Sequence, residues 1–192
     1  MHESVLNQIP LFQIRDETHI GATPQEVYTV VSDLPRSGEW SPETVGGLWV
    51  SGAPCEVGSV FRGENLRRED VVAWAPLVRG TWFTEAEVLA ADPGCSFRWA
   101  MRNKAGQAQE SVWGFEMRPV NGGCMLEHNF NMGEPTDGIR KIVEDMDESE
   151  KRRFFADWTA KLRNDLALTL DRIKAVVEQE TSAQEPTTPH RR

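Results

Sequence analysis

Residues 144–178 read EDMDESEKRRFFADWTAKLRNDLALTLDRIKAVVE, and this stretch decides the fold because it contains neither glycine nor proline. A stripe of mostly apolar residues recurs in it at spacings of three or four: Phe155, Trp158, Leu162, Leu166, Thr169, Ile173 and Val176. This spacing predicts one amphipathic helix with charged residues on its remaining faces. At ~1.5 Å per residue the helix would be about 50 Å long, unless it breaks near Met146.

The segment before this helix, from Thr44 to about Asn131, is typical of an antiparallel meander. Short β-rich runs alternate there with turns made of Gly, Pro, Asp and Asn. The strands we expect are 47–51, 59–66, 81–90, 96–102, 110–119 and 124–131. Residues 67–80 stay open, because their apolar core Val71–Trp74 suits either a strand or a lid-like loop.

The N-terminal part adds one strand and one helix. Phe12–Ile20 alternates like a strand, and Thr23, Pro24 and Glu26 then form the signature of a capped helix start. Proline should end that helix near Pro35. The order of elements predicts an α+β protein in which a curved antiparallel sheet of six to seven strands wraps around the long C-terminal helix. No other predicted element is long enough to cover the apolar face of the sheet.

This order resembles the helix-grip fold of the START/Bet v 1-like (SRPBCC) superfamily, also called the polyketide cyclase/dehydrase and lipid transport family. Residues 20–28 (IGATPQEVY) resemble its opening phrase, in which a strand runs into a capped helix. Further stretches that resemble a bacterial branch are SDLPR at 32–36, WSPE at 40–43, FRG at 61–63 with Asn65, Trp113 before Gly122–Gly123, and LTLDRIK at 168–174.

The resemblance covers about residues 12–178 and implies a domain organisation and a general role. It implies a single START-like ligand-binding domain at 1–180. The polar residues 181–192, with two prolines, are expected to form a disordered tail. Residues 69–79 look like an insertion relative to the branch and could reshape the mouth of a pocket. The superfamily includes carriers, receptors and cyclases, so the resemblance is more specific for the fold than for the activity.

Composition excludes several classes of partner. The formal net charge is −9, which disfavours a nucleic acid backbone or an anionic membrane surface as the partner. No apolar run approaches the roughly 20 residues that a membrane span needs. The three cysteines are few, odd in number and widely spaced, which suits reduced thiols in a cytoplasmic protein.

Strand alternation predicts which side chains face the helix. Charged residues assign the outer face of each strand, so the neighbouring apolar residues face inward. The ligand-binding residues predicted from this parity and from the fold are Trp40, Phe61, Gly63, Trp82, Thr84, Trp99, Met101, Trp113, Phe115, Phe130 and Trp158. Apolar walls with a few polar groups are typical of a small-molecule pocket. An ordinary core rich in aromatic residues is the alternative for each of these residues taken singly.

Three residues are the candidates for catalysis. His128 is the one histidine that parity places inward, and imidazole titrates near neutral pH. Asn65 shares the inner face and could pair with His128, which could equally bond to a backbone carbonyl. Glu43 flanks the loop of Trp40, which we expect to be an anchor or a gate, and could approach the mouth of the pocket. A carboxylate in such a place more often caps a helix or faces water.

The sequence therefore favours two functions over a third. The first is a polyketide cyclase, aromatase or dehydratase of secondary metabolism that acts without a cofactor on a polyketide-like intermediate. The second is a non-catalytic carrier or sensor of a hydrophobic small molecule, and the third is an interaction module that uses the groove for a partner. The four histidines are too scattered for a metal site, and none is expected. A homodimer remains open.

Overall fold

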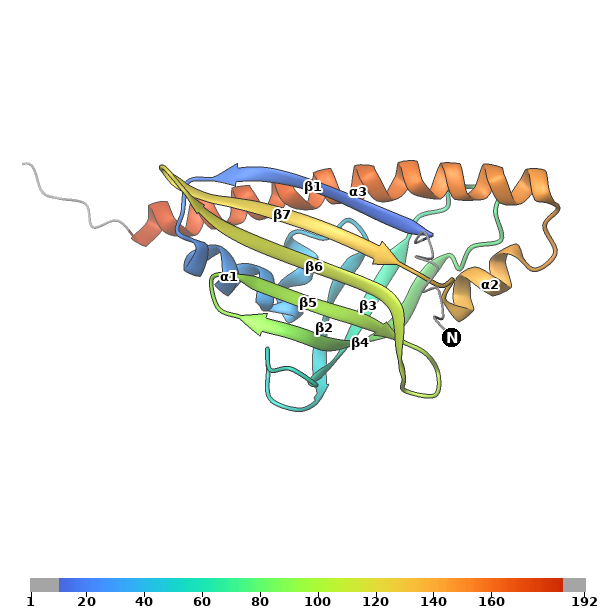
Figure 1. The fold of residues 1–192 in the computed structure, drawn as a ribbon, viewed down its shortest axis with the longest axis horizontal. Helices are drawn as coiled ribbons and strands as arrows, with labels where there is room; N and C mark the ends of the chain where they lie inside the picture. The colour runs from blue at the N-terminus through green and yellow to red at the C-terminus, as the bar shows by residue number, and fades with distance from the viewer. Residues whose placement is uncertain (1–10, 185–192) are drawn as a thin grey trace, which may run out of the picture.

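A computed structural model describes residues 11–184 and contains one open, curved, seven-stranded antiparallel sheet (Figure 1). The strand order is β1-β7-β6-β5-β4-β3-β2. The strands are β1 (Phe12–Ile20), β2 (Thr44–Ser51), β3 (Val60–Arg67), β4 (Gly80–Asp92), β5 (Ser96–Arg102), β6 (Ala108–Val120) and β7 (Gly123–Met132). Together with the long C-terminal helix, this confirms the predicted helix-grip fold. The main adjustments are that β2 begins three residues earlier than predicted and that β3 extends to Arg67.

The connection from β1 to β2 follows the predicted signals. Helix α1 (Pro24–Ser32) starts with the capping box, in which the Thr23 hydroxyl accepts from the Glu26 N–H and the Glu26 carboxylate accepts from the Thr23 N–H. A 3₁₀ helix, η1 (Leu34–Glu39), follows with Pro35 in its first turn. Its presence matters for the site, because η1 carries side chains to the interior of the molecule.

The C-terminal region contains two helices rather than one. Helix α2 (Asp137–Val143) is capped by Thr136, and helix α3 (Glu148–Gln184) begins after a break around Met146. The break near Met146 was one of the two alternatives left open by the sequence, whereas α2 was not expected. In Figure 1, α3 runs along the whole molecule beside β1 and β7, with α2 near its N-terminal end.

Helix α3 corrects two details of the predicted stripe and tail. Phe154 and Val177 are buried at its two ends, whereas the predicted Phe155 and Val176 are only half-buried. A helix turns by about 100° per residue, so a stripe drifts over ten turns and its ends shift by one residue. The helix also continues to Gln184, so residues 181–184 are helical and not tail. The expected disorder of 185–192 lies outside the described residues.

The segment between β3 and β4 is a loop and not a strand. In this β3–β4 loop (residues 68–79) the Arg79 guanidinium donates to the backbone carbonyls of Val71, Val72 and Ala75. Trp74 fastens the loop to α3 through a 2.8 Å hydrogen bond from Nε1 to the Asp157 carboxylate. The loop therefore covers the N-terminal half of α3, and three of its backbone carbonyls are paired by its own arginine.

Candidate functional site

A cavity of about 990 Å³ lies between the concave face of the sheet and α3. One end is formed by η1, and the other by the β3–β4 loop and α2. The two apolar clusters of the core border it. One gathers around α1 and the C-terminal part of α3, and the other around β1, the β3–β4 loop and the N-terminal part of α3. The size falls at the upper end of the range usual for small-molecule pockets.

The structure places ten of the eleven residues predicted to bind ligand around this cavity. They are Trp40, Phe61, Gly63, Trp82, Thr84, Trp99, Met101, Trp113, Phe130 and Trp158. Phe115 is the exception. It has no exposed surface, because His128 stacks on its ring at 4.3 Å and the Trp40 ring meets its edge at 5.7 Å. Strand alternation correctly predicted that Phe115 faces inward. Alternation does not predict whether other side chains cover an inward residue and separate it from the cavity.

His128 lines the cavity from the middle of β7. Its Nδ1 lies 3.0 Å from the Gly114 carbonyl oxygen, the backbone partner that was one of the two alternatives. Burial lowers the pKa of His128 to about 4, although the bond to Gly114 opposes this shift. The neutral ring that donates from Nδ1 keeps its lone pair on Nε2. His128 is therefore a neutral acceptor at physiological pH and a weak base.

Asn65 also lines the cavity, and its partners come from the neighbouring strands rather than from His128. Its amide nitrogen donates to the Thr84 hydroxyl at 3.1 Å, and its amide oxygen accepts from the Thr44 hydroxyl at 3.0 Å. These bonds connect β2, β3 and β4 on the concave face. Because both ends of the amide are engaged, Asn65 is held in one orientation.

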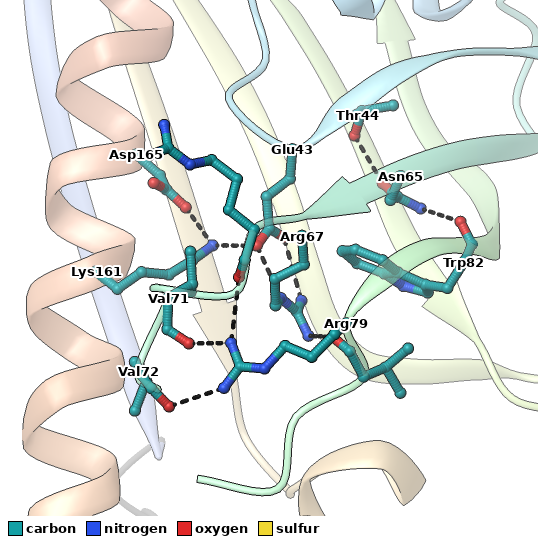
Figure 2. A network of polar contacts seen from close by, with 12 residues as sticks. Glu43, Thr44, Asn65, Arg67, Val71, Val72, Arg79, Trp82, Lys161 and Asp165 are labelled. Carbon is teal, nitrogen blue, oxygen red and sulfur yellow. Dashed lines mark hydrogen bonds and ion pairs between the residues drawn. The ribbon is translucent and has the colours of Figure 1, made fainter. Parts of the chain in front are cut away.

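Glu43 belongs to a group of four charged residues on the cavity wall, which we call the charged cluster: Glu43, Arg67, Lys161 and Asp165. Arg67 binds the Glu43 carboxylate in a bidentate manner, at 2.9 and 3.2 Å. Lys161 reaches from α3 to Glu43 at 2.8 Å and to Asp165 at 2.5 Å (Figure 2). The negative charges of the two carboxylates and the positive charges of Arg67 and Lys161 thus balance one another on the cavity wall.

The pKa values of Glu43 and Asp165 are shifted in opposite directions. Burial alone would raise the pKa of Glu43, but hydrogen bonds from Arg67 and the charges of Lys161 and Arg67 outweigh it, so this pKa is lowered. Burial raises the pKa of Asp165, because its ion pair with Lys161 compensates only part of the desolvation. Glu43 is consequently a fixed carboxylate ion, a poor candidate for proton transfer near neutral pH.

Sequence reasoning missed Arg67, Lys161 and Asp165. Arg67 also lies over the rings of Trp82 and Trp158, at 4.2 and 5.2 Å from their centroids. Two signals could have found these residues. Arg67 continues the inward parity of Phe61, Gly63 and Asn65 by one more step, and Lys161 and Asp165 each directly precede a stripe residue of α3.

Trp40 follows η1 and is buried, with 4% of its surface exposed. Its ring packs edge-on against Phe115, so it anchors its loop to the core. Ser37 lies one 3₁₀ turn earlier, lines the same cavity and is equally buried, which no pattern in the sequence indicated. Within residues 11–184, no helix is both long and apolar enough to span a membrane, and no group of three or more His, Cys, Asp or Glu could hold a metal ion.

The chain belongs to the family described as polyketide cyclase / dehydrase and lipid transport, whose profile matches residues 12–178. This confirms the resemblance noted in the sequence. An uncharacterised protein of Mycobacterium tuberculosis is 24% identical over 127 residues, which cover 57% of this chain and 75% of that protein.

Solved structures show the same fold. A polyketide-cyclase-like protein of Corynebacterium glutamicum is similar with a TM-score of 0.61 and 24% identity, covering 94% of this chain and 99% of that one. The di-domain ARO/CYC StfQ from the steffimycin biosynthetic pathway is similar with a TM-score of 0.63 and 12% identity, covering 88% of this chain and 51% of that one. At these identities the likeness establishes the fold, and the chemistry has to be argued from the site.

Proposed function

We propose that the protein is a cofactor-independent enzyme of secondary metabolism that cyclises, aromatises or dehydrates a polyketide-like intermediate in its cavity. The observation that carries the proposal is the neutral acceptor of His128 on the wall of a large, aromatic-lined cavity. Membership of the family supports it. We place the enzyme in the cytoplasm, where its three free thiols would stay reduced.

The main contribution to rate would be conformational. A poly-β-ketone is flexible and reactive, and a rigid aromatic wall that holds it in one folded shape brings one methylene next to one carbonyl carbon. The wall here is held by contacts between aromatic rings, for example between Trp113 and Phe130, whose ring centroids are 4.1 Å apart. Excluding water from this space also suppresses competing reactions of the intermediate.

His128 would contribute proton transfer or a hydrogen bond. Its Nε2 would accept a proton from a methylene between two carbonyls, the resulting carbanion would attack a third carbonyl further along the chain, and the proton would return from the imidazolium to the new alkoxide. A pKa of about 4 makes the imidazole a weak base, so its share of the rate should lie near the lower end of general-base contributions, about 10²-fold.

His128→Gln tests this assignment, because glutamine keeps a polar group of similar size that cannot act as a base near neutral pH. With a thioester-linked poly-β-ketone mimic as substrate, we expect turnover to fall about 10²-fold while the binding of the mimic changes little. Replacing the exposed His19 in the same way is the matched control. Turnover at the full rate in a folded His128→Gln protein would contradict the role of His128.

A non-catalytic carrier or sensor of a hydrophobic molecule is the second candidate. The observation that favours it is the state of Glu43, which is held as an ion by Arg67 and Lys161 and is not available to move protons. A carrier would bind the poly-β-ketone mimic and return it unchanged. Product analysis after incubation with the wild-type protein separates the two candidates.

A further inference from the structure

One face of η1 lines the η1 end of the cavity. In a 3₁₀ helix, side chains three residues apart are aligned along the axis. This spacing is found for Leu34, Ser37 and Trp40. All three line the cavity, and each has only 3–4% of its surface exposed. We call these three residues the η1 face.

The η1 face carries two polar atoms without a protein partner. Within residues 11–184, the buried side-chain atoms that have no hydrogen-bond partner are Trp40 Nε1 and Ser37 Oγ. Buried polar groups are nearly always paired, because an unpaired one has lost its contact with water and gained nothing in return. Both residues line one cavity, and the two atoms themselves have almost no exposed surface, so a ligand oxygen in the cavity would become their partner once the side chains turn toward it.

The η1 face is also held rigidly. Arg36 in η1 binds Glu39 at 2.7 Å and Glu180 of α3 at 2.5 Å, and Arg172 of α3 donates to the Ser41 carbonyl at 3.0 Å. Gly38 lies so close to β2 that a Cβ there would be 2.5 Å from the Val45 carbonyl oxygen. Relaxation of η1 to find other partners for its two polar atoms is therefore opposed on both sides.

We propose that the η1 face is a subsite for one neutral oxygen atom of the ligand, a carbonyl or hydroxyl oxygen that accepts a hydrogen bond from Trp40 Nε1, with the Ser37 hydroxyl as the second donor. This deepens the proposed function and rests on it, since it assumes that the cavity binds a small molecule. The subsite fixes one end of the ligand, and the rest of the ligand extends along the aromatic wall toward the β3–β4 loop.

The chemistry of the two groups defines the class of oxygen. The indole N–H is a donor only, so the ligand atom must be an acceptor. Neither donor is charged, and an anion taken from water into this buried place would lose far more than two neutral donors return. A ketone, quinone or phenol oxygen on an otherwise apolar, ring-forming molecule fits these conditions. A carboxylate or a phosphate does not.

The test compares two probes that differ in a single group, 9-fluorenone with its carbonyl and fluorene with a methylene in its place. The measured quantity is the dissociation constant of fluorene divided by that of 9-fluorenone. This ratio should fall about fivefold in Trp40→Phe and in Ser37→Ala, as expected for the loss of one hydrogen bond. Ser59→Ala is the matched control, because it removes a buried hydroxyl that lies outside the cavity lining and already donates to the Ala53 carbonyl. This variant should leave the ratio unchanged.

Stability gives an independent readout in the ligand-free protein. Ser37→Ala removes an unpaired polar atom, so the denaturation midpoint should stay or rise, whereas Ser59→Ala, which removes a paired buried hydroxyl, should lower it. If Trp40→Phe does not fold, the indole signal of Trp40 in a ¹H–¹⁵N spectrum replaces it. That signal should shift downfield with 9-fluorenone and not with fluorene.

The outcomes separate this inference from the proposed function. If both probes bind but the ratio changes less than twofold in Ser37→Ala and Trp40→Phe, the η1 face is not an oxygen subsite, and the cavity still binds ligands. An indole signal that does not move with 9-fluorenone means that the donors serve bound water, which also overturns the inference. Failure of both probes to bind the wild-type protein contradicts the proposed cavity function itself.

Discussion

The polar groups in two parts of the cavity differ in whether they have partners within the protein. In the charged cluster, every charge has a partner of opposite sign within 3.2 Å, and the four residues come from three segments of the sequence. On the η1 face, Ser37 and Trp40 are more deeply buried, yet their side-chain polar atoms have no partner within the described chain.

The difference indicates what each part does. Charges that are paired with one another hold the segment before β2 to β3 and α3, and this pairing leaves them less available to a ligand. The free-energy cost of two unpaired neutral donors is small enough for the fold to tolerate. These donors remain able to form hydrogen bonds with a ligand. We therefore expect the charged cluster to have a structural role, and we regard Ser37 and Trp40 on the η1 face as the candidates for ligand recognition.

The largest expected effect concerns His128, a further polar residue on the cavity wall. Its folded pKa of about 4 lies below the ordinary 6.5, so the unfolded chain takes up a proton between these values and the folded protein does not. Stability should therefore be lost as the pH falls from about 6.5 to 4, by up to about 3 kcal/mol from this residue.

Chemical denaturation of wild type and His128→Gln across this window measures the contribution of His128, because the other titrating groups cancel in the difference. His19→Gln at an exposed site is the control and should follow the wild type. Parallel pH profiles for wild type and His128→Gln would mean that His128 is not buried in its neutral form.

Breaking the charged cluster should have the next largest effect. Arg67→Met keeps most of the aliphatic stem but leaves Glu43 with Lys161 alone. Removal of one partner of a buried pair typically costs 3–5 kcal/mol, and we expect about 2 kcal/mol here because Glu43 keeps Lys161 and a fifth of its side-chain surface. Urea denaturation measures it. Arg68→Met, which breaks an exposed pair with Asp70, should change little.

Filling the cavity should affect binding more than stability. Gly63 lines the cavity in ordinary extended backbone, and a Cβ there would meet Phe61 at 3.2 Å and Thr84 at 3.5 Å. Gly63→Leu should project into the ligand space and weaken binding of 9-fluorenone at least about tenfold, which corresponds to about 1.4 kcal/mol. Gly63→Ala, with only a Cβ, is the control. Equal affinities in the two folded variants would place the ligand elsewhere.

The smallest effect is expected at the edge of the charged cluster. Burial raises the pKa of Asp165, so its charged form is already disfavoured in the folded protein. Asp165→Asn should therefore change the free energy of unfolding by less than about 1 kcal/mol, while Glu43→Gln should cost more, because Glu43 holds both Arg67 and Lys161. The opposite ranking in urea denaturation would show that Asp165 organises the cluster.

The sequence predicted the fold well because the fold depends on patterns that are local in the chain. The capping box at Thr23, the break near Met146 and the alternation of β5 are each fixed by a few neighbouring residues. The cavity walls followed from the same alternation. Helix α2 was missed because seven residues carry too little periodicity to be recognised.

The partners of the polar site residues could not be predicted, because they depend on contacts between distant segments. The partners of Glu43 come from β3 and α3, and on α3 charged side chains are usually solvated. The lack of partners at Ser37 and Trp40 is a property of the packed molecule, for which no pattern in the sequence exists. His128 was placed correctly on the inner face, but its backbone partner had to come from the structure.

The most direct test of the account is a crystal structure of the protein with 9-fluorenone bound. If the free donors of the η1 face recognise the ligand, the ketone oxygen should lie 2.7–3.2 Å from Trp40 Nε1, the range of an ordinary N–H···O bond, with the rings against the aromatic wall. A ketone oxygen bound instead to Arg67 or Lys161, or a probe outside the cavity, would contradict the division between a structural charged cluster and a recognising η1 face.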